Sequence, residues 1–130
     1  MIVLDASAAI ELLLLSSTGL RVSDRVFRGG ETVHAPELLD LEVLQVLRRR
    51  ERDGDLTSRR ALEALEDLAD MGIERYPHGL LMARVWELRA NLTAYDAVYV
   101  ALAEVLEVPL VTCDARLQRA PHDAKVEVLA

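Results

Sequence analysis

The sequence predicts an α/β fold with a mostly parallel central sheet, and three observations favour this class. Short apolar runs, the clearest at residues 2–4 and 109–113, alternate with longer segments of helical periodicity. Such alternation is typical of strands joined by crossover helices. Residues that begin and end helices (Ser, Thr, Pro and Gly) stand between the segments. No repeat or linker divides the 130 residues, so we expect a single domain over 1–130.

The first half of the chain is expected to hold two strands and three helices. The first strand ends at Asp5, and Ser7 is expected to cap the helix that follows. Gly29 closes the second helix, whereas Pro36 is well placed to open the third, which Gly54 ends. In order, the expected elements are a strand at 2–4, helices at 7–15 and 18–28, an extended piece at 32–35 and a helix at 36–53.

The second half is expected to hold more helix than strand. Thr57 and Thr93 are each expected to cap a helix, and Gly72 ends the first of these two. Trp86 lies in a third, amphipathic segment and is expected in the core or in an interface. The expected elements are a helix at 59–71, a weak strand at 73–76, helices at 79–90 and 95–106, a strand at 109–113, a short helix and a strand at 126–129.

Composition restricts the class of protein. Apolar residues make up 52% of the chain, which is enough for a core, and the lone Cys113 excludes an internal disulfide framework or a Cys-based zinc site. The N-terminus shows no basic segment before an apolar run, as a secretory signal would. The apolar run at 10–15 is too short to cross a bilayer. We therefore expect a cytoplasmic protein with no membrane partner.

The net charge of −7 alone speaks against a nucleic-acid binder, which usually has a basic surface. The charge is uneven, however, because the chain contains a dense arginine block: Arg48, Arg49, Arg50 and Arg52, followed by Arg59 and Arg60. Arginine suits bidentate contacts to phosphate. The alternative is a solvated helix end, where cations also favour the helix dipole.

Two carboxylates follow predicted strands directly. Asp5 ends the first strand and Asp114 ends the strand at 109–113. Ligands of open parallel sheets bind beyond the carboxyl ends of strands, where the strand order reverses. If the two strands are neighbours, Asp5 and Asp114 face each other across that crevice. The alternative is that each aspartate only caps the following helix.

Two further acids lie on predicted helices. Glu42 is placed within an apolar arc of its helix, where a carboxylate is costly unless something pairs with it. It is either a ligand in a shared site or a rim residue that is exposed or paired with Arg49. Asp96 stands three residues after Thr93, the spacing of a capping box, and a cap can still offer its second oxygen to a metal.

Four crowded carboxylates indicate a hard cation. Mg²⁺ and Mn²⁺ prefer oxygen ligands, and a cation relieves the mutual repulsion of the acids. A bound metal can also activate water and screen the charge of a phosphodiester. An acidic site can therefore accept a polyanion through its metal, which reconciles the net charge with a nucleic-acid substrate.

Four segments of the chain, in this order, resemble the PIN-domain ribonucleases, specifically the VapC toxins of bacterial toxin–antitoxin pairs. The resemblance covers nearly the whole chain and is specific because the blocks also have family-like separations. The blocks are IVLDASA at 2–8, APEL at 35–38 through Glu42 to LRR at 47–49, LTAYDAVYVALA at 92–103 and LVTCD at 110–114.

The resemblance implies a PIN-like three-layer α/β/α domain with a parallel sheet. It implies Mg²⁺- or Mn²⁺-dependent endonucleolytic cleavage of RNA, a homodimer, and a co-encoded antitoxin whose C-terminal segment covers the site. One departure is that many relatives have another acid shortly after the last motif aspartate, whereas this chain has Gln118 nearby and its next acid at Asp123. A second metal is therefore in doubt. The family's acidic residues, both catalytic and metal-binding, fall on Asp5, Glu42, Asp96 and Asp114.

The hypothesis from the sequence is thus a toxin ribonuclease in which Asp5, Asp96 and Asp114 coordinate the metal. Glu42 is expected to be a direct or water-mediated ligand and a possible general base, with Ser7 and Thr112 supporting the ligands. One alternative is a non-catalytic α/β binding module whose acids are helix caps. Another is a receiver-like phosphoryl-transfer protein, which usually needs adjacent acids at the end of the first strand, where this chain has Asp5 alone.

Overall fold

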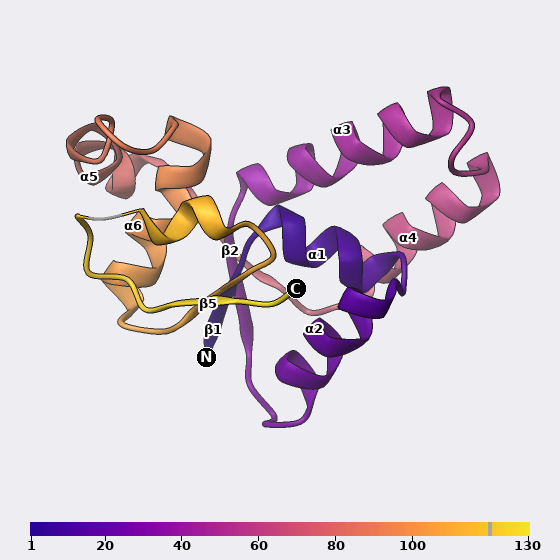
Figure 1. Ribbon diagram of the computed structural model, residues 1–130, viewed down its shortest axis with the longest axis horizontal. Helices are drawn as coiled ribbons and strands as arrows, with labels where there is room; N and C mark the ends of the chain where they lie inside the picture. Colours follow the sequence, from indigo (N-terminus) through magenta and orange to yellow (C-terminus); the bar gives the residue numbers. More distant parts are fainter. Residues whose placement is uncertain (120) are drawn as a thin grey trace.

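Five parallel strands form the central sheet of the computed structural model, which describes residues 1–119 and 121–130 (Figure 1). The strand order in the sheet is β3-β2-β1-β4-β5, and each neighbouring pair runs parallel. The described strands are β1 (Ile2–Leu4), β2 (Val33–Pro36), β3 (Glu74–Tyr76), β4 (Leu110–Thr112) and β5 (Val126–Val128). The α/β class and the parallel sheet predicted from the alternating pattern are confirmed.

Helices cover both faces of the sheet and make three layers. Helix α1 packs against β4 and α2, whereas α6 packs on β1, β2 and β4 from the other face. Helices α3 and α4 form an antiparallel arm that projects from the sheet (Figure 1). The helices are α1 (Ala6–Leu13), α2 (Ser17–Phe27), α3 (Leu38–Arg52), α4 (Ser58–Asp70), α5 (Met82–Glu87) and α6 (Ala94–Leu106), with 3₁₀ turns η1 (Gly79–Leu81) and η2 (Ala115–Gln118).

The strand order reverses between β1 and β4. From β1 the chain adds β2 and β3 on one side, then crosses back to place β4 against the other side of β1. All residues of β1 and β4 are buried, as their apolar runs predict. Their carboxyl ends therefore lie side by side at the point where parallel sheets usually bind ligands.

Two helix starts differ from the predictions. Ser7 does not cap α1, because Asp5 is the N-cap and its side chain accepts a hydrogen bond from the Ala8 amide. Pro36 does not open α3. It is the last residue of β2, where it pairs with Tyr76 of β3, and the Glu37 amide donates to the Tyr76 carbonyl. The fixed φ of proline suits an extended strand end as well as a first helical turn, and the pairing with β3 decides between them.

The helix predicted at 79–90 is shorter and is divided into η1 and α5. Only Leu81 and Leu88 of this stretch enter the core, one at each end of α5. Trp86 is 67% exposed and therefore lies outside the core. The amphipathic periodicity predicted a helix correctly. The helix is shorter than predicted, because only the residues at its two ends are anchored in the core.

The capping predictions at Thr57 and Thr93 are confirmed, since each side chain accepts a bond from the amide three residues on. Gly54 and Gly72 follow helices α3 and α4 with φ of +80° and +69°, a region that glycine enters without strain. Within the described part of the chain, no helix has both the length and the apolar character needed to span a membrane.

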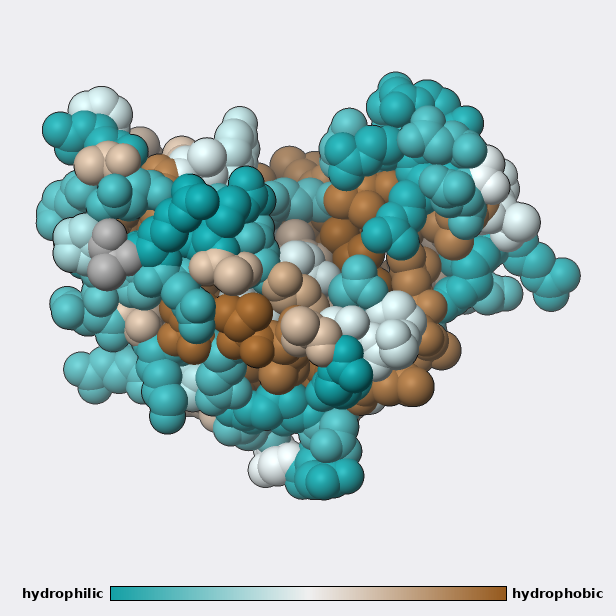
Figure 2. Space-filling view, in the orientation of Figure 1, coloured by the Kyte–Doolittle hydropathy of each residue, from teal (hydrophilic) through white to brown (hydrophobic). Residues whose placement is uncertain are grey.

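Apolar side chains gather at the surface between the α3–α4 arm and helices α1 and α2 (Figure 2). Close packing of α1 on α2 forms the base of this region. A Cβ atom on Gly19 of α2 would lie 1.9 Å from the Glu11 carbonyl oxygen, so only glycine permits the observed approach of the two helices.

Replacing Gly19 with alanine should therefore destabilise the protein by about 1–3 kcal/mol, the usual cost of overpacking. The clash is with backbone, which cannot rotate away, so α1 and α2 must separate. Thermal unfolding monitored by circular dichroism gives the measurement. Gly79→Ala is the matched control, because a Cβ there meets nothing within 4 Å. Equal melting of the Gly19→Ala and wild-type proteins would contradict the packing described here.

Candidate active site

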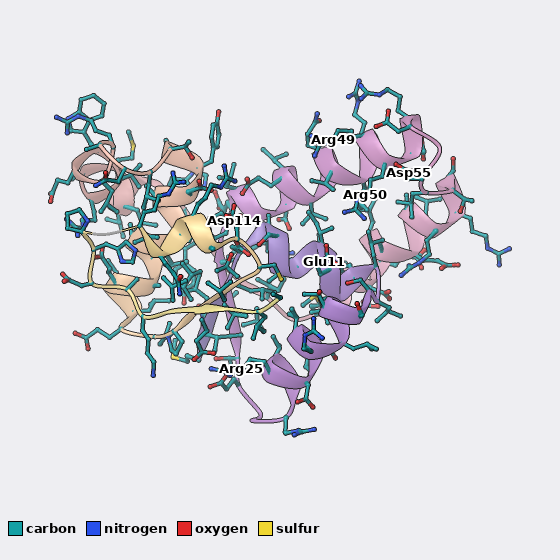
Figure 3. All side chains as sticks on the ribbon, viewed as in Figure 1. Glu11, Arg25, Arg49, Arg50, Asp55 and Asp114 are labelled. Atoms are coloured by element: carbon teal, nitrogen blue, oxygen red, sulfur yellow. The ribbon has the colours of Figure 1, made fainter. Side chains whose placement is uncertain are left out.

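Four carboxylates from four separate segments line one pocket of about 580 Å³. Asp5 follows β1, Asp114 follows β4, Glu42 lies on α3 and Asp96 lies in the first turn of α6. Figure 3 shows Asp114 close to the start of α1 and of α3, with Arg49 farther along α3. The four residues singled out from the sequence therefore share one pocket at the carboxyl ends of β1 and β4.

Asp5 is buried, with 5% of its surface exposed, and both of its carboxylate oxygens accept hydrogen bonds. Oδ1 accepts from the Ser7 hydroxyl at 2.8 Å and from the Ala8 amide at 3.0 Å. Oδ2 accepts from the Thr112 hydroxyl at 2.6 Å. Burial raises the pKa of Asp5 above its usual value, although these hydrogen bonds act in the opposite direction. Asp5 is thus both the cap of α1 and a member of the pocket.

Ser7 and Thr112 join the ends of β1 and β4. Thr112 Oγ1 donates to Asp5 and accepts from the Asp114 amide at 2.9 Å. Ser7 Oγ accepts from the Cys113 amide at 2.9 Å and lies 3.2 Å from Thr112 Oγ1. The two hydroxyls therefore hold Asp5 and the backbone of Asp114 in fixed relative positions.

Glu42 is half-buried, and its partner is a tyrosine rather than Arg49. The Tyr99 hydroxyl donates to Glu42 Oε1 at 2.6 Å. Burial raises the pKa of Glu42, and the charges of Asp5 and Asp96 raise it further. Burial and the bond to Glu42 also raise the pKa of Tyr99, which therefore stays protonated and donates.

The sequence analysis missed Tyr99, although a signal was available. Tyr99 stands three residues after Asp96, so the two side chains share a face of α6. Both residues line the pocket. A tyrosine at this spacing on a helix whose first turn points into an acidic pocket is a candidate hydrogen-bond donor.

Asp96 and Asp114 have different surroundings. The Asp96 backbone amide donates to Thr93 Oγ1 at 3.1 Å, and Asp96 itself lines the pocket. Asp114 is the N-cap of η2, accepting from the Arg116 amide at 2.9 Å. The guanidinium of Arg116 forms an ion pair with the Asp114 carboxylate and lowers its pKa below the usual value.

The donor set fits a hard divalent cation in its chemistry, because carboxylate oxygens are the ligands that Mg²⁺ and Mn²⁺ prefer. Among the described residues, however, no three His, Cys, Asp or Glu side chains are grouped closely enough to hold a metal ion. The reason is visible in the contacts. Asp5 points at Ser7, Thr112 and the Ala8 amide, and Asp114 is paired with Arg116. In the described structure the polar partners of Asp5 and Asp114 are thus protein groups.

The acid that many relatives have after the last motif aspartate is not replaced in space. Neither Gln118 nor Asp123 lines the pocket, and the Asp123 amide donates instead to Glu104 at 2.8 Å. The described structure thus gives no support for a second metal. Cys113 is unsuited to nucleophilic chemistry, since burial raises the pKa of its thiol to about 11.

The fold places the arginines of the block in different surroundings. Arg49 lines the pocket, and Figure 3 shows Arg49 and Arg50 on α3. Arg52 pairs with Asp53, while Arg59 pairs with Glu63 on the same helix. A solvated helix end therefore describes part of the block, and Arg49 is the member placed to meet a ligand of the pocket.

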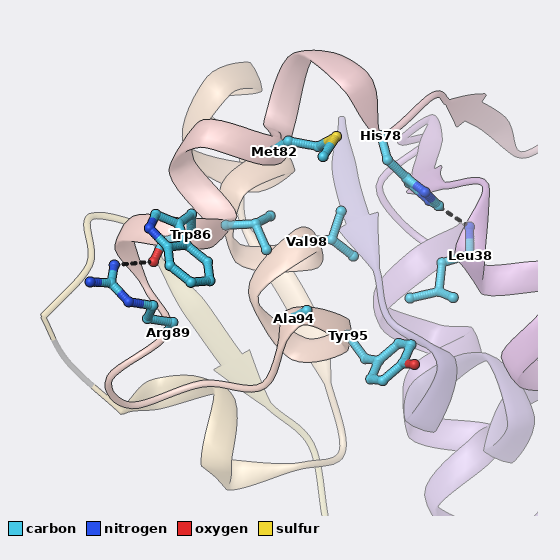
Figure 4. Close-up of a pocket in the computed structure, with 9 residues that line it drawn as sticks. Leu38, His78, Met82, Trp86, Arg89, Ala94, Tyr95 and Val98 are labelled. Carbon is cyan, nitrogen blue, oxygen red and sulfur yellow. Dashed lines mark hydrogen bonds between the residues drawn. The ribbon is translucent and has the colours of Figure 1, made fainter.

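A second cavity, of about 590 Å³, adjoins the first (Figure 4). Leu38 and Tyr95 line both cavities. The rest of its wall is mostly apolar and includes Met82, Val85 and Trp86, with the Arg89 guanidinium 4.3 Å from the Trp86 ring centroid. An exposed apolar groove thus lies directly beside the carboxylates.

Comparison with known proteins shows which family this chain resembles. The family model described as the PIN domain matches residues 2–123. The chain is 41% identical to "Ribonuclease VapC12" of Mycobacterium tuberculosis (strain ATCC 25618 / H37Rv) over 131 residues, covering 100% of both chains. It is 48% identical to "VapC ribonuclease Mb0985" of Mycobacterium bovis over 120 residues, covering 90% of this chain and 88% of that protein.

Two solved structures share the fold. The crystal structure of PAE2754 from Pyrobaculum aerophilum has a TM-score of 0.68 and 23% identity, over 96% of this chain and 82% of that chain. The structure of Mycobacterium tuberculosis VapC20, described as a "Sarcin-Ricin loop cleaving toxin", has a TM-score of 0.69 and 16% identity, over 91% and 93%. At these identities the likeness establishes the three-layer fold.

The raised pKa of Glu42 gives a prediction for the metal-free protein. Between its unfolded and folded pKa values, the folded state holds more protons than the unfolded state. The free energy of unfolding should therefore fall as pH rises through that window. Glu42→Gln removes this titratable group and keeps a side-chain oxygen that can accept the hydrogen bond from the Tyr99 hydroxyl. In chelator the variant should be the more stable protein at pH 8, and the difference should vanish below the usual glutamate pKa of about 4.3. Urea unfolding across pH measures this, and parallel stability curves would refute the cause given for Glu42.

Proposed function

The chain belongs to the PIN-domain family, among its VapC ribonucleases, and from that premise we propose that it is a metal-dependent endoribonuclease. It is the toxin of a toxin–antitoxin pair and hydrolyses phosphodiester bonds of RNA. One observation supports this best. Asp5, Glu42, Asp96 and Asp114 come from four separate segments of the chain and line one pocket.

The resident cation of the proposal is Mg²⁺ or Mn²⁺. Asp5, Asp96 and Asp114 would hold it, with Glu42 as a direct or water-mediated ligand. When bound, the cation supplies positive charge for the phosphodiester oxygens and makes water more acidic. This requirement also explains how a pocket of carboxylates can accept a polyanion.

Glu42 is the proposed general base. Tyr99 occupies Glu42 Oε1 and fixes the side chain, so Oε2 is the atom placed to accept a proton from the attacking water. A carboxylate with a raised pKa is a better proton acceptor near neutral pH than an ordinary one. As water attacks the phosphorus, its proton passes to Glu42, the scissile P–O bond breaks, and the departing ribose oxygen takes a proton from solvent water.

RNA and an antitoxin are the proposed partners. Arg49 lines the pocket and offers a guanidinium to an RNA phosphate. The family resemblance further implies a co-encoded antitoxin whose C-terminal segment covers the same pocket. The exposed Leu41, which lines the pocket beside Glu42, provides apolar surface for such a segment. A location in the cytoplasm follows from this proposal, because substrate and antitoxin are both made there.

The proposal also includes one domain over residues 1–130 and a homodimer. A single apolar cluster runs from Ile2 to Leu117 among the described residues, which favours one domain. The dimer is proposed to form over the groove of Figure 4. The groove is lined by large apolar side chains that are exposed, and such a patch is unusual for a monomer surface: Met82, Trp86 and Tyr95.

Catalysis is tested by removing one carboxylate. Asp96→Asn should lower RNA cleavage by about 10²–10³-fold or more, because it removes charge that stabilises the transition state through the metal. Asp55→Asn is the matched control, since it removes the same charge at an exposed position away from the pocket. The rate of cleavage is measured on an RNA that the wild type cuts, after melting curves confirm both folds. Wild-type cleavage by Asp96→Asn would remove Asp96 from the mechanism.

The dimer is tested by light scattering coupled to size-exclusion chromatography. Trp86→Glu places a charge in the proposed contact and should convert the dimer into a monomer at micromolar concentration. Leu62→Glu is the control, because Leu62 is 60% exposed on α4 and does not line the groove. A wild type that is monomeric, or a Trp86→Glu protein that remains dimeric, would contradict this part of the proposal.

A further inference from the structure

Arg116 occupies the acidic pocket without any role in the proposed mechanism. Its Nε lies 3.1 Å from Asp114 Oδ1 and 3.0 Å from Oδ2, and its Nη2 lies 2.6 Å from Oδ2. Both residues line the pocket together with the other three carboxylates. The sequence analysis missed Arg116, although it stands two residues after Asp114.

The surroundings of Arg116 are strongly acidic. Asp114 pairs directly with Arg116, and Asp5, Glu42 and Asp96 line the same pocket. Arg116 therefore contacts one of the three aspartates that are proposed to hold the metal and lies in the same pocket as the other two. In the described structure it supplies positive charge where a cation is expected to act.

The ion pair between Arg116 and Asp114 can also be broken at little cost. The Arg116 side chain is 61% exposed, whereas that of Asp114 is 24% exposed. Ion pairs with an exposed partner contribute little to stability, because solvent screens them and ordering a long side chain has an entropic cost. Asp114 keeps other partners: its amide donates to Thr112, and its carboxylate caps η2 by accepting from the Arg116 backbone amide. Arg116 can therefore turn away while Asp114 stays.

We propose that Arg116 is a resident counter-cation that competes with the divalent metal for Asp114 and, once displaced, binds the RNA phosphate. The exchange accounts for one of the acids, since Asp114 is paired with Arg116 in the described structure. A guanidinium released from Asp114 remains at the pocket mouth, and its planar fork suits two phosphate oxygens. The phosphate step rests on the proposed function, but the competition for Asp114 does not.

Calorimetric titration of chelator-treated protein with Mn²⁺ tests the competition without RNA. Arg116→Gln should bind Mn²⁺ about three- to tenfold more tightly than the wild type, because the competitor for Asp114 is gone. Loss of a purely structural contact would not tighten metal binding. Arg119→Gln is the matched control, as it removes the same charge from the same segment while the described residues give it no hydrogen bond to Asp114.

Two results of this titration would overturn the competition. One is an equal Mn²⁺ affinity of wild type and Arg116→Gln. The other is an equal gain in Arg119→Gln, which would assign the effect to net charge. Melting curves in chelator first show that the variants fold, and Arg116→Lys serves as a second variant that keeps the charge without the planar fork.

RNA cleavage at saturating Mn²⁺ tests the phosphate step. Arg116→Gln should lose about tenfold or more in kcat/KM despite its tighter metal binding, because a positioned phosphate contact is missing. Cleavage faster than that of the wild type would show that Arg116 only inhibits, and would overturn this step. Tighter metal binding without RNA cleavage by any of the proteins would support the competition and count against the ribonuclease.

Discussion

The hydrogen bond from Thr112 to Asp5 is the interaction on which the site depends. Thr112 is fully buried, so its hydroxyl needs partners inside the protein, and it finds them at the ends of the two strands. The bond requires β4 to lie beside β1 with Leu4 opposite Val111, which is also where the strand order reverses. With Ser7 completing the link, Asp5 and Asp114 are positioned by the sheet itself, and α3 and α6 need only bring Glu42 and Asp96 to the same place. The geometry of the pocket is therefore a property of the sheet topology.

Helix capping and metal chemistry are not exclusive in this protein. Asp5 caps α1 and Asp114 caps η2, as the non-catalytic alternative requires. That alternative does not explain Glu42, which lies within α3, caps nothing and is half-buried beside other acids. A buried carboxylate with a raised pKa costs stability and is typical of a functional site. The caps give the aspartates their positions, and the proposed metal site uses the carboxylates that are thereby placed in the shared pocket.

The sequence patterns correctly predicted the features of the fold that local structure determines. The alternation of strands and helices, the caps at Thr57 and Thr93 and the strand ends at Asp5 and Asp114 follow from neighbouring residues. The cap of α1 was predicted wrongly because the Ser7 hydroxyl makes tertiary contacts with Thr112 and Cys113 instead. The place of Pro36 was predicted wrongly because its pairing with Tyr76 of β3 decides it. Tyr99 and Arg116 were missed although their spacing from Asp96 and Asp114 was a signal, since their partners depend on how α6 meets α3 and on a turn after β4. Residue patterns singled out all four acids, and the family resemblance added the expectation that they share a catalytic and metal-binding role.

Anomalous scattering from crystals grown with Mn²⁺ tests the central claim most directly, since it locates the metal without assuming any substrate. The account predicts one strong peak in the pocket, about 2.0–2.2 Å from oxygens of Asp5, Asp96 and Asp114, with Arg116 turned away from Asp114. A pocket without a manganese peak at saturating concentration, or a peak coordinated by other residues, would contradict the assignment of these carboxylates as a metal site.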